Sequence, residues 1–218
     1  MEFEYEPYHI GSKIKFYVPK ESLILKLQDH YEKNYMDFQV VPIVFNRDSV
    51  LAPVITLLSN DEDKVFIQLN LSGNALNVIG AKPDKVYNSF ENMLNSLTEV
   101  GFDLNSTFSF YEIISNIILF LDNNIKPKTI FENITTQKFS QLNDISNIMV
   151  NHIKLSNQFT LGEDVERFEM EIYPNLTNPE RSIKLRILNR YIDYRKIKKF
   201  HYNMEDFIDE IYRKLVGE

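Results

Sequence analysis

A strand–turn–strand pattern followed directly by a long helix pattern occupies residues 64–101 and determines the fold class that we expect. The first strand alternates, with Val65, Ile67, Leu69 and Leu71 on one side and Phe66, Gln68 and Asn70 on the other. Ser72-Gly73-Asn74 is a turn sequence, and residues 76–79 form the return strand of a hairpin. Pro83 then opens a helix whose apolar residues share one side until Gly101. A one-sided sheet and a one-sided helix bury each other, so the sequence predicts an α+β fold.

The rest of the chain shows a similar order of elements in each half. In the first half we expect a helix over 19–33 and strands over 38–45 and 50–58. The second half predicts a strand over 108–121, one or two helices over 127–150, strands over 166–176 and 181–188, a turn at Asn189-Arg190 and a return strand over 191–200. Asn203 is expected to cap a last helix that ends before Gly217. Each half therefore reads as strands and hairpins covered by one long helix.

Composition excludes several classes of protein. The sequence has no cysteine, which rules out disulfides, thiol chemistry and metal sites with cysteine ligands. No apolar run is long enough to span a bilayer, and residues 1–20 contain no apolar secretory segment. We therefore expect an intracellular protein without membrane contact, in the nucleus or the cytoplasm.

Catalytic and cofactor signatures are missing from the sequence. The four histidines do not stand at metal-ligand spacing, and there is no phosphate loop, dinucleotide fingerprint or nucleophile elbow. We expect no enzyme activity, no metal and no cofactor. An enzyme whose site assembles from distant residues on an α+β fold stays open as an alternative.

Basic residues are concentrated in one segment of an otherwise acidic chain. The whole chain has a net charge of −7, whereas residues 181–200 carry eight basic groups and one acid. That segment is therefore +7, and the remainder is −14. A basic band on an acidic body indicates a surface that faces a polyanion, although two solvated strand faces would give the same composition.

Residues 66–102, FIQLNLSGNALNVIGAKPDKVYNSFENMLNSLTEVGF, resemble the core of the TATA-box-binding protein family. The resemblance lies in the turn at Ser72-Gly73, in Gly80-Ala81-Lys82 after the second strand, and in a long helix that closes with Gly101. Residues 114–117 (ISNI) resemble the start of the family's second repeat, and residues 171–176 (EIYPNL) resemble its Glu-Leu-Phe-Pro-Gly-Leu.

This resemblance implies a tandem repeat shaped as a saddle, with a curved antiparallel sheet covered by helices on one face. The repeats would span residues 1–107 and 108–218. The function implied is a transcription initiation factor that binds the minor groove of AT-rich double-stranded promoter DNA with its concave sheet. Other transcription initiation factors or RNA polymerase would be its protein partners.

The resemblance also implies a set of DNA-contacting residues. The candidates are Lys13, Phe66, Gln68, Asn70, Asn77, Asn116, Tyr173, Lys184, Arg186, Leu188, Lys196 and Lys198. For Phe66, ordinary sheet packing is an equally good interpretation, and for Asn116 a capping or turn role is. The four basic candidates of the second repeat are expected to face outward and to meet phosphates.

The sequence departs from the family at the positions that wedge between base steps. The matching positions are Val41, Asn70, Tyr173 and Leu188, and none of them is phenylalanine. Asn74 stands in place of the turn lysine, and the second hairpin lacks both glycine motifs. A second hypothesis therefore stays open, in which the chain is a non-enzymatic interaction scaffold that binds protein and not DNA.

Overall fold

The computed structural model describes residues 1–15, 25–27, 29–31, 33, 38–40, 54–59, 62–70, 74–122, 124–138, 151–157 and 166–217. The strands are β1 (Glu2–Ile14), β2 (Phe38–Val40), β3 (Val54–Ser59), β4 (Val65–Asn70), β5 (Ala75–Gly80), β6 (Phe108–Phe120), β7 (Ile153–Ser156), β8 (Arg167–Pro174) and β9 (Ser182–Tyr191). The helices are α2 (Pro83–Glu99), α3 (Leu104–Thr107), α4 (Pro127–Lys138), α5 (Tyr194–Tyr202) and α6 (Met204–Val216). The expected α+β class is confirmed.

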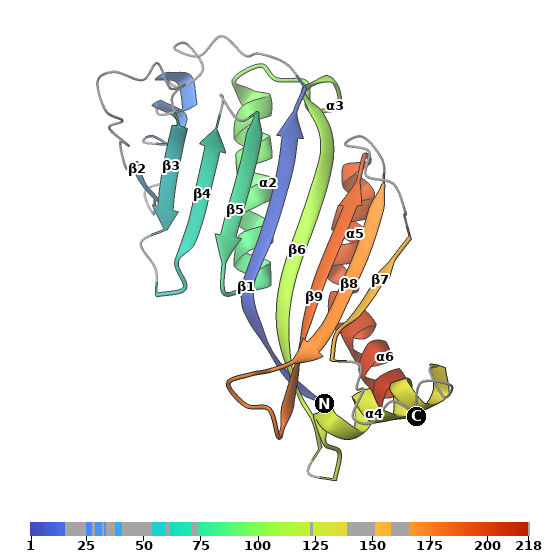
Figure 1. The fold of residues 1–218 in the computed structure, drawn as a ribbon. Helices are drawn as coiled ribbons and strands as arrows, with labels where there is room; N and C mark the ends of the chain where they lie inside the picture. The colour runs from blue at the N-terminus through green and yellow to red at the C-terminus, as the bar shows by residue number, and fades with distance from the viewer. Residues whose placement is uncertain are drawn as a thin grey trace, which may run out of the picture.

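Among the described residues, the strands form one antiparallel sheet in the order β2-β3-β4-β5-β1-β6-β9-β8-β7 (Figure 1). The long strands β1 and β6 pair with each other at its centre, with a register shift between Tyr5 and Tyr8. Because β1 also pairs with β5, and β6 with β9, the ladder of hydrogen bonds runs through the whole width of the sheet. The two halves of the chain therefore share one continuous sheet.

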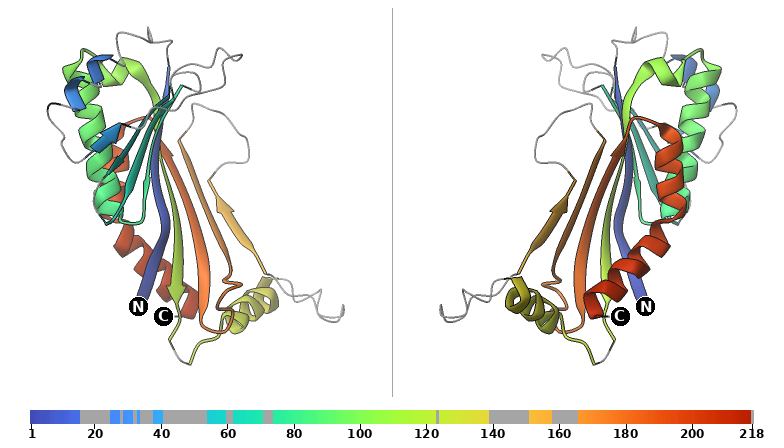
Figure 2. Two further views of the ribbon diagram at one scale, coloured as in Figure 1. Left: turned by 90° about the vertical axis from the view of Figure 1, so that its left-hand side faces the viewer. Right: turned by 90° about the vertical axis from the view of Figure 1, so that its right-hand side faces the viewer.

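Helices α2, α5 and α6 all lie on the same side of the sheet (Figure 2). Helix α2 packs against β1, β4 and β5, and α5 packs against β6 and β9. The side chains between these layers form the core, in which Ile10, Val78, Phe90, Ile187 and Ile208 are fully buried. This core is the hydrophobic layer that one-sided strands and helices require.

The two halves repeat the same sequence of neighbours. In the first half β1 lies beside β5, and β4 and β3 follow outward; in the second half β6 lies beside β9, and β8 and β7 follow outward. In chain order, β5 is the last strand of the first half and leads into α2, and β9 is the last strand of the second half and leads into α5 and α6. These three helices lie on the same side of the sheet.

Gly80 is a position where the close approach of a helix requires glycine. An added Cβ would lie 2.9 Å from Cγ2 of Val86 in α2 and 3.2 Å from the backbone oxygen of Lys64. The absence of a side chain therefore lets β5 pass into α2 while α2 stays pressed on the sheet.

The expected turn at Asn189-Arg190 and the return strand over 191–200 are wrong. Strand β9 continues through both residues to Tyr191, and α5 begins at Tyr194. The side chain of Asp193 accepts a hydrogen bond from the backbone N–H of Arg195, which is the arrangement of a helix N-cap. Ile197 and His201 are buried four residues apart, which is the spacing of one helix face and not of a strand.

The remaining predicted elements agree with the structure where it describes them. The hairpin of β4 and β5, helix α2, strand β6 and the last helix are confirmed. Residues 25–27, 29–31 and 33 are helical, whereas the rest of the helix expected over 19–33 lies outside the described residues. Residues 41–53 and 139–150, which cover parts of two predicted strands and of a predicted helix, also lie outside them.

Candidate nucleic-acid interface

The side of the sheet opposite α2, α5 and α6 is called the open face here (Figure 2). Strand β5 shows how alternation separates the two sides: Leu76 and Val78 are fully buried, whereas Asn77 and Ile79, which alternate with them, are partly exposed. The same alternation places Asn116 of β6 and Arg186 of β9 on the open face. The open face therefore offers side chains from both halves of the chain to a ligand.

An apolar row crosses the open face from one half to the other. Its members are neighbours in register on adjacent strands: Phe66 in β4, Ile79 in β5, His9 in β1, Ile114 in β6 and Leu188 in β9. Leu188 is 7% exposed, while the other members are partly exposed. Two predicted contact residues, Phe66 and Leu188, thus lie in one row at opposite ends of it.

A polar row runs beside it and changes character at the middle of the sheet. Gln68 and Asn77 lie in the first half, Gly11 follows in β1, and Glu112 and Arg190 continue the row in the second half. The members in the first half are the two amides and a glycine, which are uncharged. The members in the second half, Glu112 and Arg190, form an ion pair. This asymmetry follows the expectation that the basic residues belong to the second half.

Asn77 has a defined orientation at the centre of the open face. Its Oδ1 lies 3.1 Å from Nε2 of His9, and burial lowers the pKa of His9. A neutral imidazole that donates from Nε2 to Oδ1 leaves the amide N–H groups of Asn77 as donors toward a ligand. Gly11 makes room for this pair, because an added Cβ would lie 3.0 Å from Oδ1 of Asn77.

The basic side chains of β9 on the open face each contact a carboxylate. Lys184 Nζ lies 2.6 Å from Glu6 Oε2 of β1, across the intervening strand β6. Arg190 Nη2 lies 2.7 Å from Glu112 Oε2 of β6, and its guanidinium also covers the ring of Phe110 at 4.0 Å. Lys184 is therefore paired with a residue of β1, which lies beyond β6, and Arg190 with a residue of the neighbouring strand β6.

Strand β8 supplies the other carboxylates of the open face. Arg186 Nη1 lies 3.5 Å from Glu171 Oε1, and Arg167 Nη2 lies 2.6 Å from Glu169 Oε1. Lys154 of β7 contacts both carboxylates, at 3.2 Å and 3.3 Å. Burial raises the pKa of Glu169, but the hydrogen bonds from Arg167 and Lys154 outweigh it and hold that pKa below its ordinary value.

We call these nine groups the open-face ion-pair network. Its members are Lys154, Arg167, Lys184, Arg186 and Arg190 with Glu6, Glu112, Glu169 and Glu171. The network has one more cation than carboxylate. The three cations of the basic segment that belong to this network, Lys184, Arg186 and Arg190, therefore each lie beside an acid of β1, β6 or β8.

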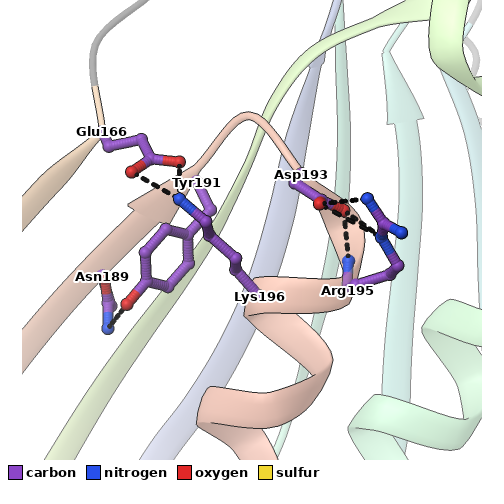
Figure 3. A network of polar contacts seen from close by, with 6 residues as sticks. All are labelled: Glu166, Asn189, Tyr191, Asp193, Arg195 and Lys196. Carbon is purple, nitrogen blue, oxygen red and sulfur yellow. Dashed lines mark hydrogen bonds and ion pairs between the residues drawn. The ribbon is translucent and has the colours of Figure 1, made fainter.

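Lys196 and Lys198 lie on α5, so their expected place on a strand of the concave sheet is wrong. Lys196 Nζ contacts Glu166 Oε1 at 2.7 Å, at the end of the sheet where β9 passes into α5 (Figure 3). Lys198 Nζ contacts Glu91 Oε1 of α2 at 2.9 Å, on the helix-covered side. Neither lysine shares the open face with Lys184 and Arg186.

The other predicted contact residues fall in three places. Asn116 lies in the middle of β6, so a capping or turn role is wrong for it. Lys13 lies near the end of β1, and Asn70 ends β4, where its backbone pairs with Val54 and Ala75. Val41, which is not one of these candidates but matches a wedge position of the family, lies outside the described residues.

Tyr173 stands beside a cleft at the outer end of the open face. The cleft has a volume of about 540 Å³, and its lining includes His152, Lys184 and the 89% exposed side chain of Leu176. The ring of His152 meets that of Tyr173 edge-on, with centroids 5.9 Å apart. Tyr173 and Lys184 are also register neighbours, so the cleft continues the open face toward the turn between β8 and β9.

The carboxylates of the network are the residues that sequence reasoning missed. Glu6 and Glu112 are remote in sequence from their cationic partners, so spacing gives no sign of the pairing. Glu169 and Glu171 did leave a signal, because Arg167, Glu169, Glu171 and Tyr173 alternate and thus share one side of β8.

In the part of the chain that the structure describes, no three histidine, cysteine, aspartate or glutamate side chains are arranged to hold a metal ion. None of the described helices is long and apolar enough to cross a membrane.

Comparison with known proteins gives a structural similarity but no match in sequence. No family model matches the chain, and no curated protein matches it. A solved structure of Methanococcus jannaschii TBP is similar to it over 100% of both chains, with 12% sequence identity and a TM-score of 0.36.

Proposed function

We propose that the protein is a divergent TATA-box-binding-like transcription initiation factor that binds double-stranded DNA with its open face. Residues 1–107 and 108–218 are its two repeats, and the sheet that the two repeats form together is the saddle. It places other initiation factors or RNA polymerase on promoter DNA and catalyses no reaction itself. The matching order of neighbours in the two halves supports the repeat, and the position of α2, α5 and α6 on one side of the sheet supports the saddle.

One observation carries the proposal: the open face joins amides and apolar side chains at its centre to cations along β9. Gln68, Asn77 and Asn116 supply the amides, and Lys184 and Arg186 supply the cations. Proteins that bind the minor groove use amide groups to read its floor, apolar side chains to contact the base steps and basic groups to contact phosphates. Minor-groove acceptors of A·T pairs are matched by the N–H donors that Asn77 presents.

The first experiment measures the affinity of the full chain for an AT-rich duplex across a potassium chloride series. Lys184→Ala/Arg186→Ala removes two open-face cations, and Arg213→Ala/Lys214→Ala removes two exposed cations from α6 on the opposite side. We expect only the open-face variant to bind more weakly, by about tenfold or more, with a slope against log salt that is shallower by about one to two. Equal losses in both variants would show a non-specific charge effect and contradict the proposal.

A second arm tests the groove. Replacing A·T pairs with I·C pairs keeps the minor-groove pattern and changes the major-groove pattern, so we expect affinity to be retained on I·C and lost on G·C. Loss on I·C duplexes would place the contact in the major groove and would refute the minor-groove part of the proposal.

A second candidate function is an interaction scaffold that binds protein on the same face. The observation that favours it is the pairing of Lys184, Arg186 and Arg190 with carboxylates, which leaves little uncompensated charge for a polyanion. Absence of DNA binding at low salt, in both the wild-type chain and the variants, would favour the scaffold.

A further inference from the structure

We propose that Glu6 and Glu171 occupy, in the unbound protein, the positions at Lys184 and Arg186 that DNA phosphates take on binding. The two carboxylates then act as built-in competitors of DNA, and binding exchanges a protein carboxylate for a phosphate at each cation. This inference rests on the proposed DNA-binding function and adds a mechanism that regulates its affinity.

The contacts of Glu6 make it a separable partner. The 2.6 Å contact with Lys184 joins β1 to β9, two strands that are not neighbours in the sheet. Glu6 lies in the register shift between Tyr5 and Tyr8, outside the paired positions of the β1–β6 ladder. Its side chain is 42% exposed and that of Lys184 is 23% exposed, so solvent and ligands reach the pair. Moving this carboxylate therefore breaks no backbone pair of the β1–β6 ladder.

Glu171 offers a second exchangeable contact. Its Oε1 lies 3.5 Å from Arg186 Nη1, which is longer than a normal charge-assisted hydrogen bond, and the guanidinium side chain is 35% exposed. Lys154 Nζ lies 3.3 Å from the same carboxylate, so Glu171 keeps a cationic partner when Arg186 turns to a phosphate. The exchange at this position therefore leaves no unpaired buried acid.

The ion pair of Arg190 and Glu112 is expected to stay intact when DNA binds. Both side chains are 14% exposed, two guanidinium nitrogens lie 2.8 Å and 2.7 Å from one carboxylate oxygen, and the guanidinium also covers Phe110. Separating a nearly buried pair leaves two poorly solvated charges, which costs more than separating an exposed pair. The inference is therefore restricted to Glu6 and Glu171.

Carboxylate exchange has a thermodynamic signature. When a protein cation without a carboxylate partner binds a DNA phosphate, counterions are released from the DNA, and this release favours binding. In this protein the cation must first separate from its carboxylate, and the free energy of that separation offsets part of the favourable counterion release. The wild-type chain therefore binds DNA more weakly than its number of cations implies. Removing the carboxylate charge leaves the cation available and strengthens binding most at low salt.

The experiment compares Glu6→Gln/Glu171→Gln with the wild-type chain on the same AT-rich duplex and salt series. Glutamine keeps the size of the side chain and removes its charge. The matched control is Asp209→Asn/Glu210→Gln, which removes two acids that pair with Arg213 and Lys214 on α6, away from the open face. Both variants change net charge equally. Thermal unfolding of each variant, and the single variant Glu6→Gln, show whether a change in affinity arises from misfolding.

We expect the open-face variant to bind about 3- to 30-fold more tightly at low salt, with a steeper dependence on log salt, and the control to match the wild type. Equal affinity and slope in the wild type and the open-face variant would overturn the inference while leaving the proposed function intact. An equal gain in the control would also overturn it, because net charge would then explain the effect. If no form binds the duplex, the proposed function fails and the inference fails with it.

Discussion

The imidazole of His201 lies flat on the ring of Tyr87, with ring centroids 4.2 Å apart and planes inclined by 7°. Tyr87 belongs to α2 and His201 to α5, so this stack joins the helices of the two halves. The hydroxyl of Tyr8 lies 2.9 Å from Nδ1 of His201, which adds the central strand β1 to the same contact. Helices far apart in sequence are thereby fixed to one strand.

Replacing His201 is expected to weaken the fold. His201→Ala removes the stack on Tyr87 and leaves the buried hydroxyl of Tyr8 without its partner, at a cost of about 2–4 kcal/mol in the free energy of unfolding. Urea unfolding measures it, with His152→Ala as the control because His152 is half exposed at the far edge of the sheet. A loss no larger than that of the control would show that the stack contributes little.

The same histidine makes stability depend on pH. Burial lowers the pKa of His201 below its ordinary value of 6.5, although Asp84 opposes the shift. The unfolded chain therefore binds a proton near pH 6.5 that the folded chain does not bind, and stability falls as the pH drops below that value. We expect the unfolding free energy to fall between about pH 7.5 and 5.5 by at most about 1.4 kcal/mol per pH unit from this group. In His201→Phe the fall should be smaller, with the part that His9 contributes remaining.

Glu91 accepts hydrogen bonds from three side chains at the seam between α2 and α5. The hydroxyls of Tyr87 and Tyr194 lie 2.9 Å and 3.0 Å away, and Lys198 Nζ lies 2.9 Å away. We expect Glu91→Ala to lower the free energy of unfolding by about 1–2 kcal/mol. Double-mutant cycles should give a larger coupling of Glu91 with Tyr194 than with Lys198, because solvent screens the exposed lysine. Equal couplings would contradict this ranking.

Gly80→Ala is expected to destabilise the first half by about 1–3 kcal/mol, because its Cβ would press on Val86 Cγ2. Removing that contact atom in Gly80→Ala/Val86→Ala should recover part of the loss relative to the sum of the single changes. The remainder reflects the approach to the backbone oxygen of Lys64, which no side-chain change relieves. Thermal unfolding of the four proteins checks this, and strict additivity would show that Val86 is not the obstacle.

Gly11→Ala is expected to act on DNA recognition more than on stability. The added Cβ would lie 3.0 Å from Oδ1 of Asn77 and 3.2 Å from Nε2 of His9, so the pair that orients the amide must shift. We expect affinity for an AT-rich duplex to fall by about tenfold, with reduced discrimination against G·C pairs. Asn77→Ala should give the same loss, and the double variant should add little to it. If the losses of affinity in the two single variants added up in the double variant, Gly11 and Asn77 would act independently, which would contradict this prediction.

The sequence predicts the elements whose periodicity is local. Alternation around Ile67 and the stripe that includes Phe90 were enough to find the hairpin and helix α2, and both are confirmed. Helix α5 was mistaken for a strand because its many cations hide the helical spacing of Ile197 and His201. The charge balance of the open face was not predictable, because Glu6 and Lys184 are 178 positions apart and meet only in the folded sheet. Local patterns specify elements, whereas the electrostatics of a surface depend on which strands become neighbours.

The central position of β1 has a consequence for how the chain reaches this fold. Ile10 is in register with Val78 on one side and with Ile113 on the other, so both neighbours of β1 follow it at long range in the sequence. During synthesis the backbone amides and carbonyls on both edges of β1 cannot form their sheet hydrogen bonds until β5 and β6 have been made. Contacts of such high sequence separation slow folding, because the chain loses loop entropy before the strands pair. The last strand pairing at the centre of the sheet, and not helix formation, is therefore expected to limit the rate at which new chains become native.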